Sequence, residues 1–390
     1  MIGSPQRQYE AGSKRTTTAF RLLMLFLCCV TVIGVAAQAQ IVLPSSGDIA
    51  TVAGDGNPGY YGDGGQATSA YLYYPHGVAV DASGNIYIAD TNNYVIRKVT
   101  ASTGDISTVA GNGTSGYSGD GAAATSAELG TPRGLALDSS GNIYIGDTFY
   151  NVVRKVTVST GYISTVAGNG SSGYTGDGGL ATSATLNNPS YLALDASGNL
   201  FISDLYNYVV REVSGGYINT VAGGGTPCIG KSDFLGDGCA ATNAELAEPE
   251  GIALDSYGNL YIADCGAQTV REVVKSTGAI SGVVGTFNTY GFSGDGGLAG
   301  SAELNSPFDV KVDGSNNLYV ADTGNQRIRK VLASTGDIST VGGNGNDGYT
   351  GDGGAATSAD LNNPEFIAVD ASQNIYISDT YNFVIRVISY

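Results

Sequence analysis

Short apolar runs, separated by turn-forming residues, recur along almost the whole chain. Within residues 132–168, four such runs (GLALD, NIYIGD, VVRKVTV and YISTVA) are separated by SSG, TFYN and STG. Runs of five to seven residues bounded by Gly, Ser, Asn and Asp are typical of β-strands joined by tight turns. The pattern predicts a unit of four short antiparallel strands.

The unit occurs six times, and its pattern predicts how the copies pack. The second strand carries bulk on both faces, with Ile143 and Ile145 on one and Tyr144 on the other. Such a strand is covered on both sides, which neighbouring units stacked face to face would provide. The middle of the first strand is small in five units, as expected beside a crowded axis: Ala79, Ala136, Ala193, Ala253 and Ala368.

The phase of the repeat indicates a closed ring. Residues 48–54 read as a lone fourth strand, whereas residues 383–389 read as a third strand that no fourth follows. If the leading strand completes the last unit, the ring closes and no open sheet edge remains. The alternative, a linear solenoid, gains nothing from this offset. We expect an all-β, six-bladed β-propeller of four-stranded antiparallel blades over residues 40–390, closed by its N-terminal strand.

Residues 1–39 have the features of a secretory signal peptide. Four Lys or Arg residues precede the uncharged apolar run 22–37, and small residues stand at positions 37 and 39. We expect the signal to be cleaved and the protein to be secreted, periplasmic or on the cell surface. An uncleaved anchor is the alternative, although 16 residues are few for a bilayer span. Once the signal is removed, we expect no membrane association.

Two units carry a family resemblance in full. Residues 75–99 read PHGVAVDASGNIYIADTNNYVIRKV, and residues 307–331 read PFDVKVDGSNNLYVADTGNQRIRKV. They resemble the NHL repeat, and the likeness extends over nearly all of residues 48–390. The tract GYSGDGAAATSAELGTP (116–132) looks like the connections in bacterial secreted NHL proteins and in teneurin NHL domains. The resemblance implies a propeller whose faces bind proteins, peptides, sugars or RNA; a few relatives, and the similarly shaped lactonases, are enzymes with a metal in the central channel.

Two charged residues recur in every unit. An Asp ends the second strand and an Arg lies in the third: Asp90, Asp147, Asp204, Asp264, Asp322 and Asp379, with Arg97, Arg154, Arg211, Arg271, Arg329 and Arg386. A buried charge needs a partner, so we expect each Asp to pair with the Arg of its own unit and brace the blade.

A further Asp occurs in the GDG tract of every loop between units: Asp63, Asp120, Asp177, Asp237, Asp295 and Asp352. We expect each to close an Asx turn, because an Asp before Gly commonly does so. A ring of calcium ligands is the alternative, but each loop offers one carboxylate among glycines rather than the spaced ligands of a calcium loop.

Three cysteines follow the signal. Cys228 and Cys239 lie in one lengthened loop, and secretion permits oxidation, so we expect them to form a disulfide and leave Cys265 free. The alternative pairing is Cys239 with Cys265. Three Cys in this arrangement do not suggest a zinc site.

The slots where the units differ are the candidate binding residues. They follow the Pro that begins each first strand, and in one unit Lys311 replaces the usual Ala. We expect them to ring the mouth of the channel on the face that carries the long loops, where a polar concavity would bind a ligand. Drift at an exposed rim explains them equally well. The residues are His76, Arg133, Ser190, Tyr191, Glu250, Phe308, Asp309, Lys311 and Glu365.

The leading functional hypothesis is a secreted, non-catalytic binding or scaffold module for a protein or a glycan. The net charge of −17 opposes a nucleic-acid partner, because such affinity depends on cations that neutralise phosphates. Tyrosines in the loops would suit a protein or a sugar, although packing of the loops on the blades explains them more simply. They are Tyr60, Tyr61, Tyr117, Tyr174 and Tyr349.

The rival hypothesis is a metal-dependent lyase or lactone hydrolase. His76 is the single histidine, which excludes a multi-His zinc site, and no Ser-His-Asp triad can be built. A calcium ion bound by Glu250, Glu365 or Asp309 is the remaining version of this rival; otherwise we expect no cofactor and no catalytic residues. A self-assembling surface protein is a third alternative.

Overall fold

The computed structural model describes residues 1, 3, 40–225 and 236–390. It divides into two compact units, residues 1–38 and 39–390. The predicted signal peptide lies almost wholly outside the described residues, and so does Cys228. In the part of the chain that the structure describes, no helix is both long and apolar enough to cross a bilayer.

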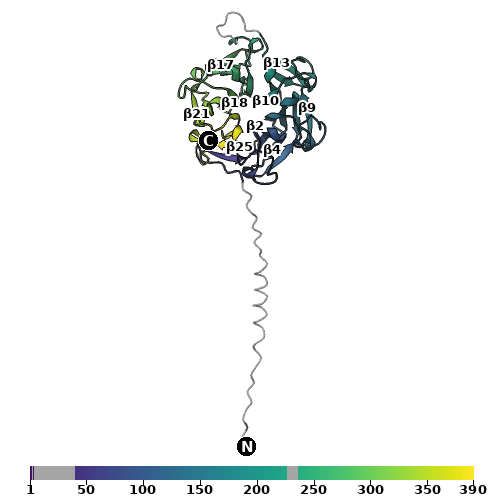
Figure 1. Cartoon of the computed structure of the whole chain (residues 1–390), viewed down its shortest axis with the longest axis vertical. Coiled ribbons are helices and arrows are strands. Elements are labelled where there is room, and N and C mark those ends of the chain that lie inside the picture. Colours follow the sequence, from purple (N-terminus) through teal and green to yellow (C-terminus); the bar gives the residue numbers. More distant parts are fainter. Residues whose placement is uncertain (2, 4–39, 226–235) are drawn as a thin grey trace. The chain divides into compact units, whose positions relative to one another are not determined.

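The second unit is a six-bladed β-propeller (Figure 1). This confirms the fold predicted from the sequence. In the described part of the chain, the strands of the first three blades run from the axis outward as follows: β2 (Pro75–Val80), β3 (Ile86–Asp90), β4 (Val95–Val99) and β5 (Ile106–Ala110); β6 (Pro132–Leu137), β7 (Ile143–Asp147), β8 (Val152–Thr157) and β9 (Tyr162–Ala167); β10 (Pro189–Leu194), β11 (Leu200–Asp204), β12 (Val209–Ser214) and β13 (Tyr217–Gly223).

The remaining blades repeat this antiparallel order. They comprise β14 (Pro249–Leu254), β15 (Leu260–Asp264), β16 (Thr269–Val273) and β17 (Ile280–Val284); β18 (Pro307–Val312), β19 (Leu318–Asp322), β20 (Arg327–Val331) and β21 (Ile338–Gly342); and β23 (Pro364–Val369), β24 (Ile375–Asp379), β25 (Val384–Ile388), β1 (Asp48–Ala53) and the short β22 (Gly354–Ala355). Blades are numbered 1 to 6 from the one that contains β2.

The N-terminal strand closes the ring. β1 pairs antiparallel with β25, with Ile49 opposite Ile388 and Thr51 opposite Arg386. On its other side β1 pairs with β22, which belongs to the loop that leads into the same blade. The predicted closure is therefore confirmed, and the outer strand of the last blade has a partner on both sides, which removes an open edge.

The core lies between neighbouring blades rather than within them. One cluster of buried residues joins Ile96 and Ala110 of blade 1 to Leu135 and Ile145 of blade 2. Each sheet is thus covered on its two faces by the two neighbouring blades, as the bulky residues on both faces of the second strand predicted. Burial of this kind along every blade-to-blade contact stabilises the ring as a whole.

Two sets of three-residue 3-10 helices occupy the connections. One set lies in the loops between blades: η1 (Ala67–Ser69), η3 (Ala124–Ser126), η5 (Ala181–Ser183), η7 (Ala241–Asn243), η9 (Ala299–Ser301) and η11 (Ala356–Ser358). The other set joins the second strand of a blade to its third: η2 (Thr91–Asn93), η4 (Thr148–Tyr150), η6 (Leu205–Asn207), η8 (Cys265–Ala267), η10 (Thr323–Asn325) and η12 (Thr380–Asn382).

The pairing of the inner strands defines two faces. Pro75, which begins β2, pairs with Asp90, which ends β3, so the loops between blades and the η2-type turns share one face, called here the loop-bearing face. Val80 pairs with Ile86 at the other end of the same strands, where tight turns such as residues 81–85 connect them. This second side is called the turn-bearing face.

Candidate functional site

An Arg in the third strand of every blade contacts two carboxylates. Its guanidinium lies 3.1–4.0 Å from the Asp that ends the second strand and 2.5–2.6 Å from the Asp of the GDG tract. The six Arg and the six strand Asp are at most 1% exposed. Each Asp predicted to pair with an Arg is therefore in contact with it. The effect of these pairs on stability remains a prediction.

GDG carboxylates fasten their loops to the outer strand in four blades instead of closing Asx turns, namely Asp63, Asp120, Asp237 and Asp352. Asp63, for example, accepts a hydrogen bond from the backbone N–H of Thr108 in β5, at 3.1 Å, with the oxygen that does not face Arg97. Its flanking Gly62 has a φ of +100°, and a Cβ there would come within 2.8 Å of Ala70. The Asx-turn expectation fails because the loop folds along the blade edge, which turns the carboxylate toward Arg97.

Asx turns form elsewhere, between the first and second strands. In blade 1, Asp81 Oδ1 accepts from the N–H groups of Ser83 at 2.9 Å and Asn85 at 3.0 Å. Asn85 also donates its side-chain amide to Asp81 Oδ2 at 2.8 Å. The same bonds recur in the corresponding turns of the other blades, so the DxxxN tract specifies the turn that the GDG tract was expected to make.

Burial controls the acidity of the strand Asp. It raises the pKa of Asp90 to about 6, although the side chain of Asn93, the N–H of Tyr73 and Arg97 each act to lower it. The pKa of three further strand Asp is raised to about 6 for the same first reason: Asp147, Asp204 and Asp379.

The loop tyrosines pack on the Arg of the blades. The guanidinium of Arg97 lies 5.0 Å from the ring centre of Tyr60, and the Tyr60 hydroxyl is 2.8 Å from Thr108 Oγ1. Three other loop tyrosines repeat both contacts: Tyr117, Tyr174 and Tyr349. Tyr61 instead contacts the ring of Tyr71 at 5.3 Å. These contacts support the simpler of the two explanations for the loop tyrosines, namely that they pack the loops on the blades.

The slots that vary between blades converge on the axis, where two aromatic rings stack. Tyr191 of β10 and Phe366 of β23 belong to opposite blades, and their ring centres lie 4.2 Å apart at an angle of 8°. They are 2% and 3% exposed. The same slot is Gly in three other blades, namely Gly77, Gly134 and Gly251, where a Cβ would collide with the first strand of the next blade. We call this group, with the polar residues around it, the plug.

A charged triad lies beside the stack. Glu365 Oε2 is 3.1 Å from His76 Nε2 and 3.1 Å from Arg133 Nη2, and Glu365 Oε1 accepts from the side-chain amide of Asn363. Burial, assisted by the charge of Arg133, lowers the pKa of His76. Burial alone would raise the pKa of Glu365, but the bonds from His76 and Arg133 hold it below its usual value. Arg133 and His76 keep some solvent exposure, with 19% and 14% of their side-chain surface.

Other polar groups of the plug are buried more deeply. Asp309 Oδ1 is 2.5 Å from Lys311 Nζ, and its other oxygen accepts from the N–H of Ile367 in the next blade at 3.0 Å. Ser190 donates to the carbonyl of Asn188 at 3.4 Å. Burial raises the pKa of Asp309, against the opposite effects of Lys311 and two backbone N–H groups.

Glu250 is the least compensated of these groups. It is 5% exposed, and no described protein group donates a hydrogen bond to its Oε2. Burial raises its pKa to about 8, against the lowering effect of Arg133. Two further buried atoms of the plug, Tyr191 Oη and Arg133 Nε, also have no partner among the described residues.

The predicted mouth is thus filled at this level of the channel. Ser190, Tyr191, Glu250, Asp309 and Glu365 are all at most 6% exposed. The sequence reasoning placed them on an open rim, but two rings from opposite blades are long enough to meet at the axis and cover their neighbours. Two predicted residues are less buried than this group: Phe308 is half-buried at the start of β18, and Lys311, which contacts Asp309, is half-buried further along the same strand.

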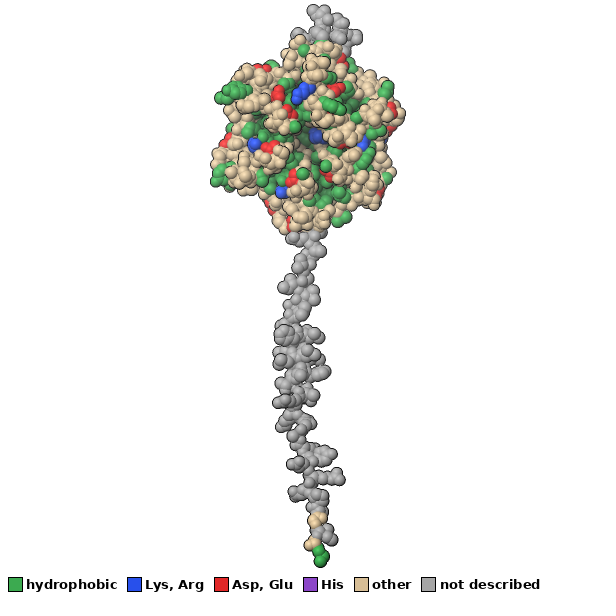
Figure 2. All heavy atoms as spheres, turned by 180° about the vertical axis from the view of Figure 1, so that it is seen from behind, with side chains coloured by type: hydrophobic (Ala, Val, Ile, Leu, Met, Phe, Trp, Pro, Cys, Tyr) green, Lys and Arg blue, Asp and Glu red, His purple; other side chains and the backbone are tan. Residues whose placement is uncertain are grey.

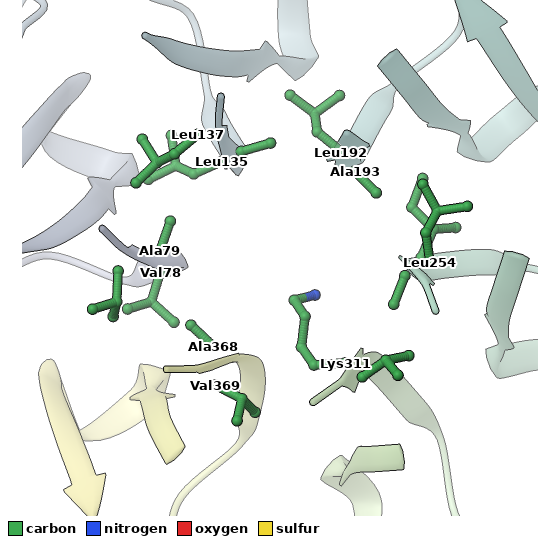
Figure 3. Close-up of a pocket in the computed structure, with 15 residues that line it drawn as sticks. Val78, Ala79, Leu135, Leu137, Leu192, Ala193, Leu254, Lys311, Ala368 and Val369 are labelled. Carbon is green, nitrogen blue, oxygen red and sulfur yellow. The ribbon is translucent and has the colours of Figure 1, made fainter. Parts of the chain in front are cut away.

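Beyond the plug the channel opens into a cavity of about 240 Å³. Its wall consists of Ala, Val, Leu and Ile from the second halves of the inner strands, including the small residues predicted there, together with Lys311. Figure 2 shows a hollow at the centre of one face, bordered mainly by hydrophobic side chains. In Figure 3 the Lys311 side chain projects from β18 into the central space.

Exposed aromatic side chains form an arc on the loop-bearing face. They occupy the second residue of the η2-type turns in three blades, where Phe149, Tyr206 and Tyr381 are 67%, 55% and 51% exposed. Tyr74, just before β2, extends the group between blades 6 and 1, since its ring centre lies 5.5 Å from that of Tyr381. Tyr73 is adjacent to it and 37% exposed. We call these five residues the aromatic arc.

The sequence reasoning missed the aromatic arc, although the signal was present. The same turn position varies freely among the six units, which is the criterion that selected the residues after the Pro. In blade order it is Asn92, Phe149, Tyr206, Gly266, Gly324 and Tyr381. Gly in two units shows that the turn itself needs no aromatic residue.

Metal ligands and thiols are sparse. Among the described residues, no three His, Cys, Asp or Glu side chains lie close enough together to hold a metal ion. Cys265 is a free, buried thiol, which excludes its pairing with Cys239. The predicted disulfide between Cys228 and Cys239 stays a prediction, because Cys228 lies outside the described residues.

Fold and site together define a closed propeller whose axis is filled by the plug. The aromatic arc lies on its loop-bearing face, and the apolar cavity lies toward its turn-bearing face. The family model of the teneurin NHL domain matches residues 41–115 and 216–291, and that of the NHL repeat matches residues 304–331. These matches, with the six blades, show that the chain belongs to the NHL-repeat family.

Two relatives and one solved structure illustrate the likeness. Teneurin-1 of Gallus gallus is 31% identical over 69% of this chain, which spans 11% of that protein. NHL repeat-containing protein 2 of Bos taurus is 28% identical over 81% of this chain, which spans 46% of that protein. An auxiliary nutrient binding protein from Bacteroides thetaiotaomicron superimposes with a TM-score of 0.62 at 17% identity, covering 87% of this chain and 75% of the other. That last likeness shows the fold alone.

Proposed function

We propose that this chain is a secreted, non-catalytic binding module that recognises a glycan or a protein through its loop-bearing face. The observation that carries the proposal is the aromatic arc. Phe149, Tyr206 and Tyr381 expose more than half of their surface, at a position where other blades have Gly or Asn. Aromatic rings of this kind give a partner a large contact area, and Tyr adds a polar group for a hydrogen bond.

The packing of the blades does not account for these rings. The loop tyrosines, such as Tyr60, bond to a blade Arg and a Thr, whereas Phe149 contacts only the neighbouring ring of Tyr150 among the aromatic contacts of the described residues. Exposed aromatic residues grouped on one face are typical of interaction sites. The partly exposed Arg133 and His76 of the plug supply charge and hydrogen-bonding groups at the centre of the same face.

The family setting supports a binding role. A protein of the same fold is described as an auxiliary nutrient binding protein. The rival hypothesis, a lyase or lactone hydrolase, needs a carboxylate-bound metal in the channel. A stoichiometric metal found by elemental analysis of purified residues 40–390 would favour that rival.

The test compares two variants of residues 40–390 on a glycan array and on a panel of purified cell-surface proteins. The triple variant F149G/Y206G/Y381G gives each turn the Gly that blades 4 and 5 carry. The control is Y257S, which removes a 75% exposed Tyr from the turn-bearing face, at a position where other units have Ser. We expect wild type and Y257S to bind the same partner and the triple variant to lose it. If the triple variant still binds, or if wild type binds nothing on either panel, the proposal is wrong.

A further inference from the structure

The cavity beyond the plug differs chemically from the loop-bearing face. Its lining residues include Val78, Leu135 and Leu254, and Lys311 is the charged residue among the described side chains that form its wall. The lining reaches the last residues of the inner strands, which directly precede the turns of the turn-bearing face. Since the plug fills the other end, a ligand enters from the turn-bearing face.

Lys311 breaks an otherwise regular wall. The corresponding residue is Ala in the other five blades, so neither the strand nor its pairing requires a long side chain. The ammonium is 2.5 Å from Asp309 Oδ1 and 3.2 Å from the carbonyl of Val310. An ammonium has three N–H donors, so one remains beyond these two bonds for an acceptor in the cavity.

The charges and the size restrict the ligand. Asp309 already neutralises Lys311 at 2.5 Å, so an anionic ligand would have to displace this internal pair. An uncharged acceptor, such as a carbonyl oxygen, fits better. An apolar cavity of about 150 Å³ accepts benzene, and about 240 Å³ therefore accommodates one ring with a short substituent.

We propose that the axial cavity is a second binding site, for a small, uncharged, largely apolar molecule whose single hydrogen-bond acceptor is bound by Lys311. The site does not depend on the aromatic arc. The apolar body of the ligand contacts the Val and Leu wall, and the remaining N–H of Lys311 orients its acceptor.

The experiment uses two probes of nearly equal shape, acetophenone and α-methylstyrene, of which only the first has an acceptor. Their binding to residues 40–390 is measured by ligand-observed NMR titration. We expect acetophenone to bind wild type about tenfold more tightly, which is what one hydrogen bond from a charged donor contributes. K311M keeps the apolar stem and removes the donor, so the preference should vanish while α-methylstyrene binding is retained.

Two further variants make the result decisive. A193F fills the cavity from another blade and should abolish binding of both probes. F149G/Y206G/Y381G alters only the loop-bearing face and should bind both probes like wild type, whether or not it still binds a glycan or protein. Thermal unfolding verifies that each variant is folded. If wild type binds neither probe at millimolar concentration, or if A193F binds like wild type, there is no such site. An acceptor preference that survives in K311M would show that Lys311 does not bind the acceptor.

Discussion

The edge of each blade repeats the same residues in all six blades, whereas the axis of the ring has different residues in each. At the edge, all six blades repeat one arrangement, in which a buried Arg lies 2.5–2.6 Å from a GDG Asp. At the axis, the two slots after the Pro hold a different pair of residues in each of the six blades. The first region therefore repeats its contacts, whereas the contacts of the second differ from blade to blade.

This contrast separates stability from function. A contact that every unit repeats explains how six small sheets remain a ring. A slot that holds a different residue in each blade is not required by the ring, so its residues need another explanation. The varied slots, at the plug, in the aromatic arc and at Lys311, are therefore the positions at which we look for binding.

The largest effect should follow from breaking one brace. Arg154 donates to Asp120, to the carbonyl of Ser118 at 2.9 Å and to the carbonyl of Glu128 at 2.8 Å. Arg154→Ala leaves the buried Asp147 without its cation, and we expect a loss of about 3–5 kcal/mol in the free energy of unfolding. Urea denaturation measures it.

The matched control is the neighbouring residue. Lys155 pairs with Asp138 at 3.3 Å, but its side chain is 24% exposed. Lys155→Ala should therefore change the free energy of unfolding by less than about 1 kcal/mol. Equal losses from the two substitutions would mean that the buried Arg154 stabilises the fold no more than the partly exposed Lys155 does.

The second prediction concerns the pH dependence at the axis. The folded pKa of Glu250, about 8, is above its ordinary value of 4.5, so the folded state holds a proton that the unfolded state has lost between these values. Stability therefore falls as pH rises toward 8. Four brace Asp, whose pKa is raised to about 6, act in the same direction only up to about pH 6. Burial also raises the pKa of Asp264, Asp309 and Asp322, so these groups add to the fall in stability, whereas His76, whose pKa is lowered, has little further effect above pH 6.5.

Between pH 6.5 and 8, Glu250 alone should contribute about 2 kcal/mol to this fall. Gln cannot ionise, so Glu250→Gln should show a fall that is smaller than that of wild type by about 2 kcal/mol over this range. Urea denaturation at several pH values compares the two proteins. The same slope in both would show that Glu250 is not the group responsible.

The smallest change in stability should follow a substitution in the stack of Tyr191 and Phe366. The hydroxyl of Tyr191 is buried without a partner among the described residues, so Tyr191→Phe removes an unsatisfied group and keeps the ring. We expect stability to rise by about 1 kcal/mol. A loss of about 1 kcal/mol, seen as a lower thermal midpoint, would instead show that the Tyr191 hydroxyl makes a hydrogen bond in the folded protein.

The sequence predicted the fold well because the repeat encodes it. The alternation within each unit and the offset of residues 48–54 sufficed for the blades and their closure. The position of the plug could not be predicted in the same way. Whether Tyr191 and Phe366 lie on a rim or meet at the axis depends on the radius of the ring and on which blades are opposite. The partner of Asp63 also depended on how its loop folds along the blade edge.

The central claim is that slots shared by all blades specify the scaffold and that slots in which blades differ bind the partner. The most direct test is the affinity of F149G/Y206G/Y381G for the glycan or protein that wild type selects. We expect the affinity of this variant to fall about hundredfold, because exposed aromatic anchors commonly dominate such interfaces. Its thermal midpoint should equal that of wild type. An affinity equal to that of wild type would contradict the central claim.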